Sequence, residues 1–337
     1  MSTINRQLRL KTRPEGLVQR DNFDLVEQPL DELKDGEVLV RALYLSMDPT
    51  NRVWMRDIAQ YMPPVAIGEV MRSFGLGRVV KSRSTHYREG DLVQGLLGWQ
   101  DYLVVHDSAK GYVRLPANPG IALPTLLGAC GMSGVTAYYG MTDIAPVKAG
   151  ETLVVSAAAG SVGSIAGQIG KIMGARVVGI AGGAEKCRYL LDELGFDAAV
   201  DYKAENWKQA LKDATPDGVH VNFENVGGEI MAAVLSRMVI GGRVALCGLI
   251  SGYNSDERAS DNFSVIIVKR LVVSGFLVLD YAKTKEAVHV LASWIREGKL
   301  KAEETVAEGL ENAPDVINRL FDGSHRGKLL LKVAADV

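Results

Sequence analysis

The chain has 337 residues, of which 47% are hydrophobic and 23% are charged, and its formal net charge is −2. This composition is typical of a soluble globular protein that is long enough to form two domains, each with its own core. A nearly balanced charge argues against nucleic acid or an anionic membrane as a partner, and we predict neither.

The N-terminal third is predicted to be rich in short strands. Strand candidates, separated by turn residues such as Gly90-Asp91, cover residues 37–47, 75–82, 92–95 and 99–105. Short strands with turns between them favour a small barrel-like or sandwiched β domain.

From about Gly131 onward, the pattern changes to alternating strands and helices. Strands are predicted for the apolar run that begins at residue 152 and for residues 176–180, 198–202, 219–224, 243–248 and 271–278. Helices are predicted between them, over residues 185–194, 204–214 and 229–238, then over 283–297, while Phe263–Arg270 is paired with the last strand. This alternation predicts a parallel, doubly wound sheet of about six strands. The final apolar run, Leu329–Val333, is expected to return as a strand to the first domain.

The three cysteines, Cys130, Cys187 and Cys247, are far apart, and no CxxC pair occurs. Neither a disulfide framework nor a cysteine-based zinc site is therefore predicted. The first residues, MSTINRQLRLKTRP, contain no apolar segment typical of a secretory signal. Two uncharged stretches, residues 115–142 and 152–170, are interrupted by glycines and small polar residues, which favours buried segments over membrane spans. We expect a reducing, cytoplasmic setting.

The junction at residues 152–163, TLVVSAAAGSVG, leads an apolar strand into a glycine turn. Gly160 and Gly163 have the spacing of the last two glycines of a dinucleotide-binding motif, with Ala158 in place of the first. Glycines let backbone N–H groups approach a pyrophosphate, and the following helix directs its positive N-terminus at the same charge. Within a strand–turn–helix–strand unit of about 30 residues, a cofactor site is favoured over a purely structural turn.

The second strand of this unit ends in Gly179–Lys186, with glycines and alanine where an acidic residue usually binds the ribose 2′-hydroxyl of NAD. Lys186 suits a cofactor that carries a 2′-phosphate, although it is equally typical of a solvated lysine. Asn225 follows a later strand and fits a contact with the cofactor ribose, or a simple turn beside Gly227-Gly228.

Five ordered motifs resemble one known family. They are Leu45–Arg52, Gly131–Gly140, Ala157–Gly163, Asn225–Gly228 and Cys247–Asn254. Together with the order of the domains, they resemble the medium-chain dehydrogenase/reductase superfamily, and within it the leukotriene B4 dehydrogenase/prostaglandin reductase group. That group includes plant double-bond reductases and bacterial curcumin reductase-like enzymes.

The resemblance implies an α/β fold in which a Rossmann doubly wound parallel sheet (residues 126–299) is joined to a β-rich, GroES-like catalytic domain (residues 1–125 and 300–337). It also implies a zinc-independent, NADP(H)-dependent reductase of the carbon–carbon double bond in α,β-unsaturated aldehydes and ketones. Ser46-Met47-Asp48 stands where alcohol-oxidising relatives have a zinc-binding cysteine. A homodimer through residues 271–278 is the family's expected assembly.

Site residues are carried over by the same resemblance. Cofactor contacts are expected at Met132, Thr136, Gly160, Ser161, Val162, Gly163, Lys186, Tyr202, Asn225, Cys247, Ile250, Ser251, Tyr253, Phe276, Leu277 and Val278. Three positions depart from the family pattern: His325 precedes the Arg-Gly-Lys run where relatives have asparagine before Gly-Lys, Ser133 replaces a proline, and Thr50 replaces a tyrosine. The last two changes are expected to reshape the substrate pocket.

Conjugate reduction needs hydride delivery to the β-carbon and a hydrogen-bond donor for the charge that develops on the carbonyl oxygen. A tyrosine hydroxyl is an uncharged donor at neutral pH. Tyr253 and Tyr61 lie in family-matching segments, and we prefer Tyr253 as the direct donor, acting with a ribose hydroxyl of the cofactor. A zinc-independent quinone reductase and a non-catalytic binding protein are the alternatives.

Overall fold

The computed structural model describes residues 3–58, 60–254 and 264–336. These residues divide into two compact units. The β unit contains the chain up to Leu127, Thr305–His325 and the residues from Leu329 onward. The α/β unit contains Gly128–Glu304 and Arg326–Lys328.

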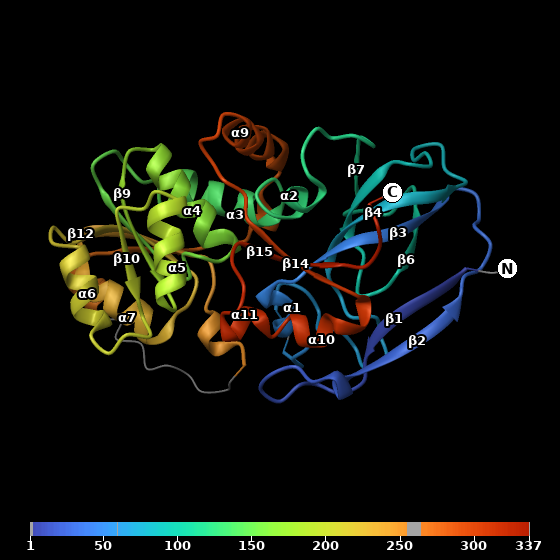
Figure 1. The fold of residues 1–337 in the computed structure, drawn as a ribbon, viewed down its shortest axis with the longest axis horizontal. Coiled ribbons are helices and arrows are strands. Elements are labelled where there is room, and N and C mark those ends of the chain that lie inside the picture. Colours follow the sequence, from blue (N-terminus) through green and yellow to red (C-terminus); the bar gives the residue numbers. More distant parts are fainter. Residues whose placement is uncertain (1–2, 59, 255–263, 337) are drawn as a thin grey trace. The chain divides into compact units, whose positions relative to one another are not determined.

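The β unit is built on one seven-stranded sheet and a separate hairpin (Figure 1). The sheet has the order β14-β15-β3-β4-β5-β7, with β6 pairing β3. Its strands are β3 (Glu37–Ser46), β4 (Phe74–Ser82), β5 (Leu92–Leu96), β6 (Tyr102–His106), β7 (Val113–Leu115), β14 (Glu304–Glu308) and β15 (Lys328–Lys332). The hairpin joins β1 (Ile4–Leu10) to β2 (Phe23–Pro29), and the helices are α1 (Pro49–Trp54), α2 (Leu123–Leu127), α10 (Ala313–Val316) and α11 (Arg319–Asp322).

The predicted return of the C-terminal tail is confirmed. β15 pairs antiparallel with β3, and Leu331 lies opposite Leu45. The strand predicted from residue 99 begins only at Tyr102, because the backbone of Trp99 bonds to Met71 and Leu8 instead of to β3.

The α/β unit contains a six-stranded parallel sheet with the order β10-β9-β8-β11-β12-β13. The strands are β8 (Thr152–Val155), β9 (Arg176–Ala181), β10 (Ala198–Asp201), β11 (Val219–Glu224), β12 (Met238–Leu246) and β13 (Val272–Gly275). Numbered along the chain, this order is that of a doubly wound sheet, which confirms the predicted fold class.

Helices cover both faces of this sheet. Leu153 and Val155 of β8 belong to a core cluster with α3 (Met132–Tyr139), α4 (Ser161–Ile172) and α9 (Thr284–Arg296). Val154, between them, belongs to a second cluster with α6 (Trp207–Ala214) and α7 (Gly228–Arg237). The alternation follows from the period of two along a strand, and Figure 1 shows α6 and α7 grouped apart from α3, α4 and α9. Among the described residues, no helix is both long and apolar enough to cross a membrane.

Several predicted boundaries in this unit were wrong. The helix predicted to run through Met238 ends one residue earlier, because Met238 starts β12 and the β-branched Val239-Ile240 favour an extended backbone. The strand predicted to reach Val278 ends at Gly275, because the neighbouring β12 pairs no further than Leu246. Residues beyond it form a short helical turn, η5 (Val278–Asp280).

The remaining helices also start or end differently from their predicted ranges. The helix predicted over residues 185–194 consists of α5 (Ala184–Arg188), which continues as a π-helical turn, η3 (Tyr189–Glu193). The helix predicted from residue 204 begins at Trp207. Of the predicted segment Phe263–Arg270, α8 covers Ser264–Lys269, whereas Phe263 lies outside the described residues.

Candidate cofactor and active site

The order of the parallel sheet reverses direction between β8 and β11, which are neighbours. Chain segments that leave these strands at their carboxyl ends therefore start side by side, the arrangement that forms ligand crevices in open α/β sheets. The glycine turn follows β8, and the segment that starts at Asn225 follows β11. Two of the predicted cofactor motifs thus lie at the same edge.

The glycine turn is tightly closed around the carbonyl group of Ala157. Gly160 donates its N–H to this oxygen at 2.9 Å and then caps α4. A Cβ atom at Gly163 would lie only 2.4 Å from the same oxygen, so only glycine allows α4 to start so close to the turn. Gly327 adds a bond from its N–H to the oxygen of Ala159. The strand, turn and open first turn of α4 form a cradle that fits a pyrophosphate.

At the end of β9, the residues expected to select the cofactor surround a pair of glycines. Gly183 caps α5, which carries the half-buried Lys186. A Cβ atom at Gly182 would lie 2.9 Å from the ring of Tyr202, so the tyrosine packs directly on this backbone. Asp201, which sequence reasoning missed, accepts the N–H of Gly183 at 2.7 Å and therefore holds the turn.

The backbone oxygens of Asn225 and Val226 accept hydrogen bonds from the segment that follows β12. The oxygen of Asn225 accepts the N–H of Ile250 at 3.1 Å. The oxygen of Val226 accepts both the N–H and the hydroxyl of Ser251, the latter at 2.6 Å. Cys247 is tied to the last residue of β11, since its N–H bonds the oxygen of Glu224. The structure therefore brings the predicted residues of the 247–253 segment against the turn after β11.

Tyr253 lies at the end of that segment, just after η4 (Ile250–Gly252). Its hydroxyl oxygen accepts the N–H of Leu249 at 3.3 Å. Accepting this bond uses a lone pair and not the hydroxyl proton. Tyr61 belongs to the β unit, is 43% exposed, and shares a hydrogen bond with the hydroxyl of Thr50.

Met132 and Thr136 are one turn apart on α3 and share a face of this helix. The hydroxyl of Thr136 donates to the oxygen of Met132 at 2.8 Å. Both residues belong to the α/β unit, as do the glycine turn and Asn225.

The loop after β13 carries Phe276, Leu277 and Val278. The ring of Phe276 packs against Gly140, whereas Leu277 is 37% exposed. Further along, the ring of Tyr281 stacks on Tyr139 with 3.9 Å between centroids, and Tyr281 donates its hydroxyl to Asp143 at 2.7 Å. Burial and the bond to Asp143 raise the pKa of Tyr281 to about 12. The sequence analysis did not predict these contacts of Tyr281, which hold the loop after β13 against Tyr139 and Asp143.

His325, which departs from the family pattern, contacts the backbone of α11. A ring nitrogen of His325 lies 2.7 Å from the backbone oxygen of Arg319. Arg326, the next residue, lies 3.5 Å from the carboxylate of Glu193 and 3.4 Å from that of Glu303. The Arg326 side chain is therefore engaged with two carboxylates of the α/β unit.

No group of three or more His, Cys, Asp or Glu side chains within the described ranges is placed to hold a metal ion. Ser46 donates its hydroxyl to the carboxylate of Asp48. His86 faces the carboxylate of Asp107 at 3.2 Å. Burial raises the pKa of the Cys247 thiol to about 12, helped by the nearby Glu224, so the thiol is neutral at physiological pH.

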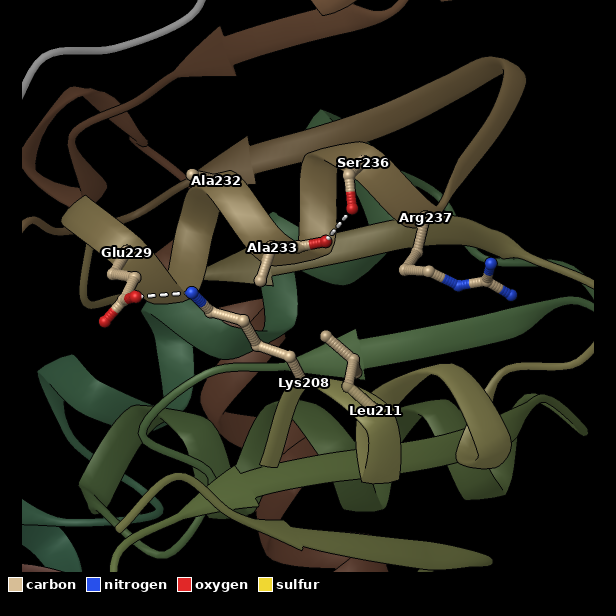
Figure 2. A pocket seen from close by; sticks show the side chains of 7 residues that line it. All are labelled: Lys208, Leu211, Glu229, Ala232, Ala233, Ser236 and Arg237. Atoms are coloured by element: carbon tan, nitrogen blue, oxygen red, sulfur yellow. Dashed lines mark hydrogen bonds and ion pairs between the residues drawn. The ribbon is translucent and has the colours of Figure 1, made fainter. Parts of the chain in front are cut away.

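A pocket of about 290 Å³ lies elsewhere, between α6 and α7 (Figure 2). Lys208 and Glu229 form an ion pair at one end, and Arg237 lies at the other. None of the predicted cofactor residues lines it.

Each of the two units contains the match to one known family model. A family model for the N-terminal domain of oxidoreductases matches residues 6–113, and a model for zinc-binding dehydrogenases matches residues 161–293. The chain is 41% identical to the NADPH-dependent curcumin reductase of Escherichia coli over 98% of both chains. It is 36% identical to the NADP(+)-dependent 2-alkenal reductase of Nicotiana tabacum, again over 98% of both chains.

Among solved structures, CurA from Vibrio vulnificus in complex with NADPH matches with a TM-score of 0.92 and 37% identity, covering 98% of this chain and 99% of that one. The chain therefore belongs to the medium-chain dehydrogenase/reductase superfamily. Within it, the chain is a member of the NADPH-dependent reductases that include curcumin, prostaglandin and 2-alkenal reductases. Its cofactor is NADP(H).

Replacing Gly163 by alanine is expected to damage both folding and cofactor binding. The added methyl group meets the backbone oxygen of Ala157, which cannot move without opening the turn. Overpacking of this kind lowers the free energy of unfolding by about 1–3 kcal/mol. Chemical denaturation and NADPH titration check this. Gln209→Ala, at an exposed position of α6 outside the proposed site, is the control and should leave both quantities nearly unchanged.

Lys186→Ala is expected to reduce the preference for NADPH over NADH. A charge-assisted contact with a 2′-phosphate is worth about 1.5–3 kcal/mol, or roughly 10- to 150-fold in affinity. Measured dissociation constants for both cofactors check this, with Lys208→Ala as the control that removes the same charge outside the site. Unchanged discrimination in Lys186→Ala would remove this residue from the phosphate site.

Proposed function

We propose that this protein uses NADPH to reduce the carbon–carbon double bond of α,β-unsaturated aldehydes and ketones. The observation that carries the proposal is the position of Tyr253. This neutral hydroxyl stands in the segment that is hydrogen-bonded to the turn after β11, at the carboxyl edge where the glycine cradle also lies. The 2-alkenals named for the tobacco relative are α,β-unsaturated aldehydes, which supports the same substrate class.

Bound NADPH supplies the hydride. The first turn of α4, with Gly160 and Gly163, would hold its pyrophosphate, and Lys186 with Tyr202 would hold the 2′-phosphate. Asn225 would orient the ribose. The glycine turn, Tyr202 and Asn225 are fixed by contacts within the α/β unit, which supports a site that is largely formed before the cofactor binds.

Tyr253 would donate its hydroxyl proton in a hydrogen bond to the carbonyl oxygen of the substrate. Hydride arrival at the β-carbon places negative charge on that oxygen, so the bond is stronger in the transition state than in the ground state. The N–H of Leu249 holds the tyrosine oxygen from the other side. Tyr61 is the second candidate for this role.

The reaction class is tested by following NADPH oxidation with a panel of 2-alkenals, enones and quinones. Turnover of alkenals and enones, with a saturated carbonyl as product, supports the proposal. Turnover restricted to quinones would assign the chain to quinone reduction, and binding of NADPH without any turnover would indicate a non-catalytic binding protein.

Tyr253→Phe is expected to slow the chemical step. Loss of one such donor costs on the order of 3 kcal/mol, or about 100-fold in rate, although a ribose hydroxyl can compensate in part. The phenylalanine ring keeps the packing, so NADPH affinity should change less than the rate. Single-turnover hydride transfer at saturating enone and NADPH measures this. An unaltered rate constant would transfer the role to Tyr61 or to the ribose.

Activity is expected to be independent of zinc. The position of the zinc-binding cysteine in alcohol-oxidising relatives is occupied by Ser46-Met47-Asp48, and a serine hydroxyl is not among the usual zinc ligands. Treatment with a chelator followed by metal analysis and an activity assay checks this. Stoichiometric zinc whose removal abolishes turnover would contradict it.

A further inference from the structure

Glu224 is a carboxylate in the interior of the α/β unit, and its role was not evident from the sequence. It is the last residue of β11 and is 0% exposed. Burying a carboxylate is costly unless it is paired or hydrogen-bonded. The available signal was an acidic residue at the end of a strand whose alternate residues, Val219, Val221 and Phe223, are apolar.

Four donors surround this carboxylate. Oε1 accepts the hydroxyl of Ser156 at 2.8 Å, the N–H of Val226 at 2.7 Å and the N–H of Gly227 at 2.8 Å. Oε2 accepts the side-chain amide of Asn222 at 3.0 Å. The donors are Ser156, which directly follows β8, Asn222 of β11, and two residues of the turn after β11.

These bonds fix the direction of the next ones. An ionised carboxylate only accepts, so Ser156 must donate its proton to Glu224. The lone pairs of Ser156 then accept the N–H of Asn225 at 2.8 Å. The side-chain nitrogen Nδ2 of Asn225 donates to the backbone oxygen of Ser156 at 2.7 Å. This bond fixes the orientation of the side-chain amide, and its oxygen Oδ1 is the atom that would accept a hydrogen bond from the cofactor.

The same turn holds the segment that carries Tyr253. The oxygens of Asn225 and Val226 accept N–H bonds from Ile250 and Ser251. Glu224 thus holds the turn through its N–H groups. The carbonyl groups of the same turn hold the segment around Ile250 and Ser251.

We propose that Glu224 is a positioning residue for NADPH binding: it holds the turn after β11, and through Ser156 it sets the orientation of Asn225 at the carboxyl edge of the sheet. It touches neither substrate nor cofactor. The inference rests on the role of Asn225 in the proposed function, and it needs no particular substrate.

Glutamine and alanine at this position have different expected effects. In Glu224→Gln, the remaining oxygen can still accept the three bonds made to Oε1, while the new amide faces Asn222. The oxygen Oδ1 of Asn222 is buried without a hydrogen-bond partner in the described part of the chain, so a flip of this amide provides an acceptor. Glu224→Ala removes the acceptor altogether and leaves the turn without its anchor.

The experiment compares NADPH dissociation constants, measured by equilibrium fluorescence titration, for the wild type, Glu224→Ala and Glu224→Gln. Backbone hydrogen exchange of Val226 and Gly227 is measured in the cofactor-free protein. We expect Glu224→Ala to weaken NADPH binding by about tenfold or more, since it removes hydrogen bonds to a charged group, and to accelerate exchange at both amides. Glu224→Gln should remain close to the wild type in both measurements.

Two further variants separate positioning from a general loss of stability. Thr215 is also fully buried, and its hydroxyl bonds the oxygen of Leu211, outside this network. Thr215→Val should lower stability without changing the NADPH dissociation constant. Ser156→Ala removes only the hydroxyl between Glu224 and Asn225 and should weaken NADPH binding even if Glu224→Ala does not fold.

Unchanged NADPH affinity in Glu224→Ala and Ser156→Ala would overturn the proposal. An equal loss in Thr215→Val or in Glu224→Gln would overturn it too, because the effect would then follow stability or charge. Failure of the wild type to reduce enones while it binds NADPH would refute the proposed function and leave this comparison intact.

Discussion

The backbone oxygen of Ala157 occupies the space that a side chain at Gly163 would need, and this close approach determines where α4 begins. The turn requires backbone strain at Ala157. Its φ of 48° lies in the left-handed region, which costs a non-glycine residue about 1–2 kcal/mol. Neighbouring bonds hold it there: Ala158 donates to Ile180, and Gly327 donates to Ala159. The proposed phosphate site is thus held by backbone hydrogen bonds without any ligand, which reduces the cost of ordering it on binding.

The same edge contains a buried carboxylate, that of Glu224, although NADP(H) is an anion. Two effects oppose each other here. An uncompensated carboxylate would repel phosphates strongly in a medium of low dielectric constant. Glu224, however, accepts four hydrogen bonds, two of them from backbone N–H groups, and each bond to a charged group contributes about 1.5–3 kcal/mol. These donors stabilise the carboxylate locally, while the proposed phosphate contacts come from Lys186 and from the N-terminus of α4.

Features that depend on local pattern were predictable from the sequence. The glycine turn, the strands β8 to β11 and the return of Leu331 to Leu45 follow from apolar runs and turn residues. The bonds of Trp99 with Leu8 and Met71 were not predictable, because they join segments far apart in the chain. For the same reason the end of β13 at Gly275 depends on where its neighbour stops, and nothing within residues 271–278 encodes it. In the proposed site, Asn225 was predicted from its place after a strand. The hydrogen bond between Ser156 and Glu224 was not predictable, because it forms only when β8 and β11 lie side by side.

In the proposed function a tyrosine hydroxyl, and not a metal ion, stabilises the charge that develops on the substrate oxygen, and this difference accounts for the large share of backbone contacts in the proposed site. A zinc ion needs a few strong ligands whose positions can be read from cysteine and histidine spacing. A neutral hydroxyl donor instead depends on the placement of its own segment, and Tyr253 is held by the N–H of Leu249 within a stretch anchored to Asn225 and Val226. Because a hydrogen bond weakens steeply with poor geometry, such a site needs an ordered support behind it. A fully bonded carboxylate under the turn provides that support without entering the chemistry itself.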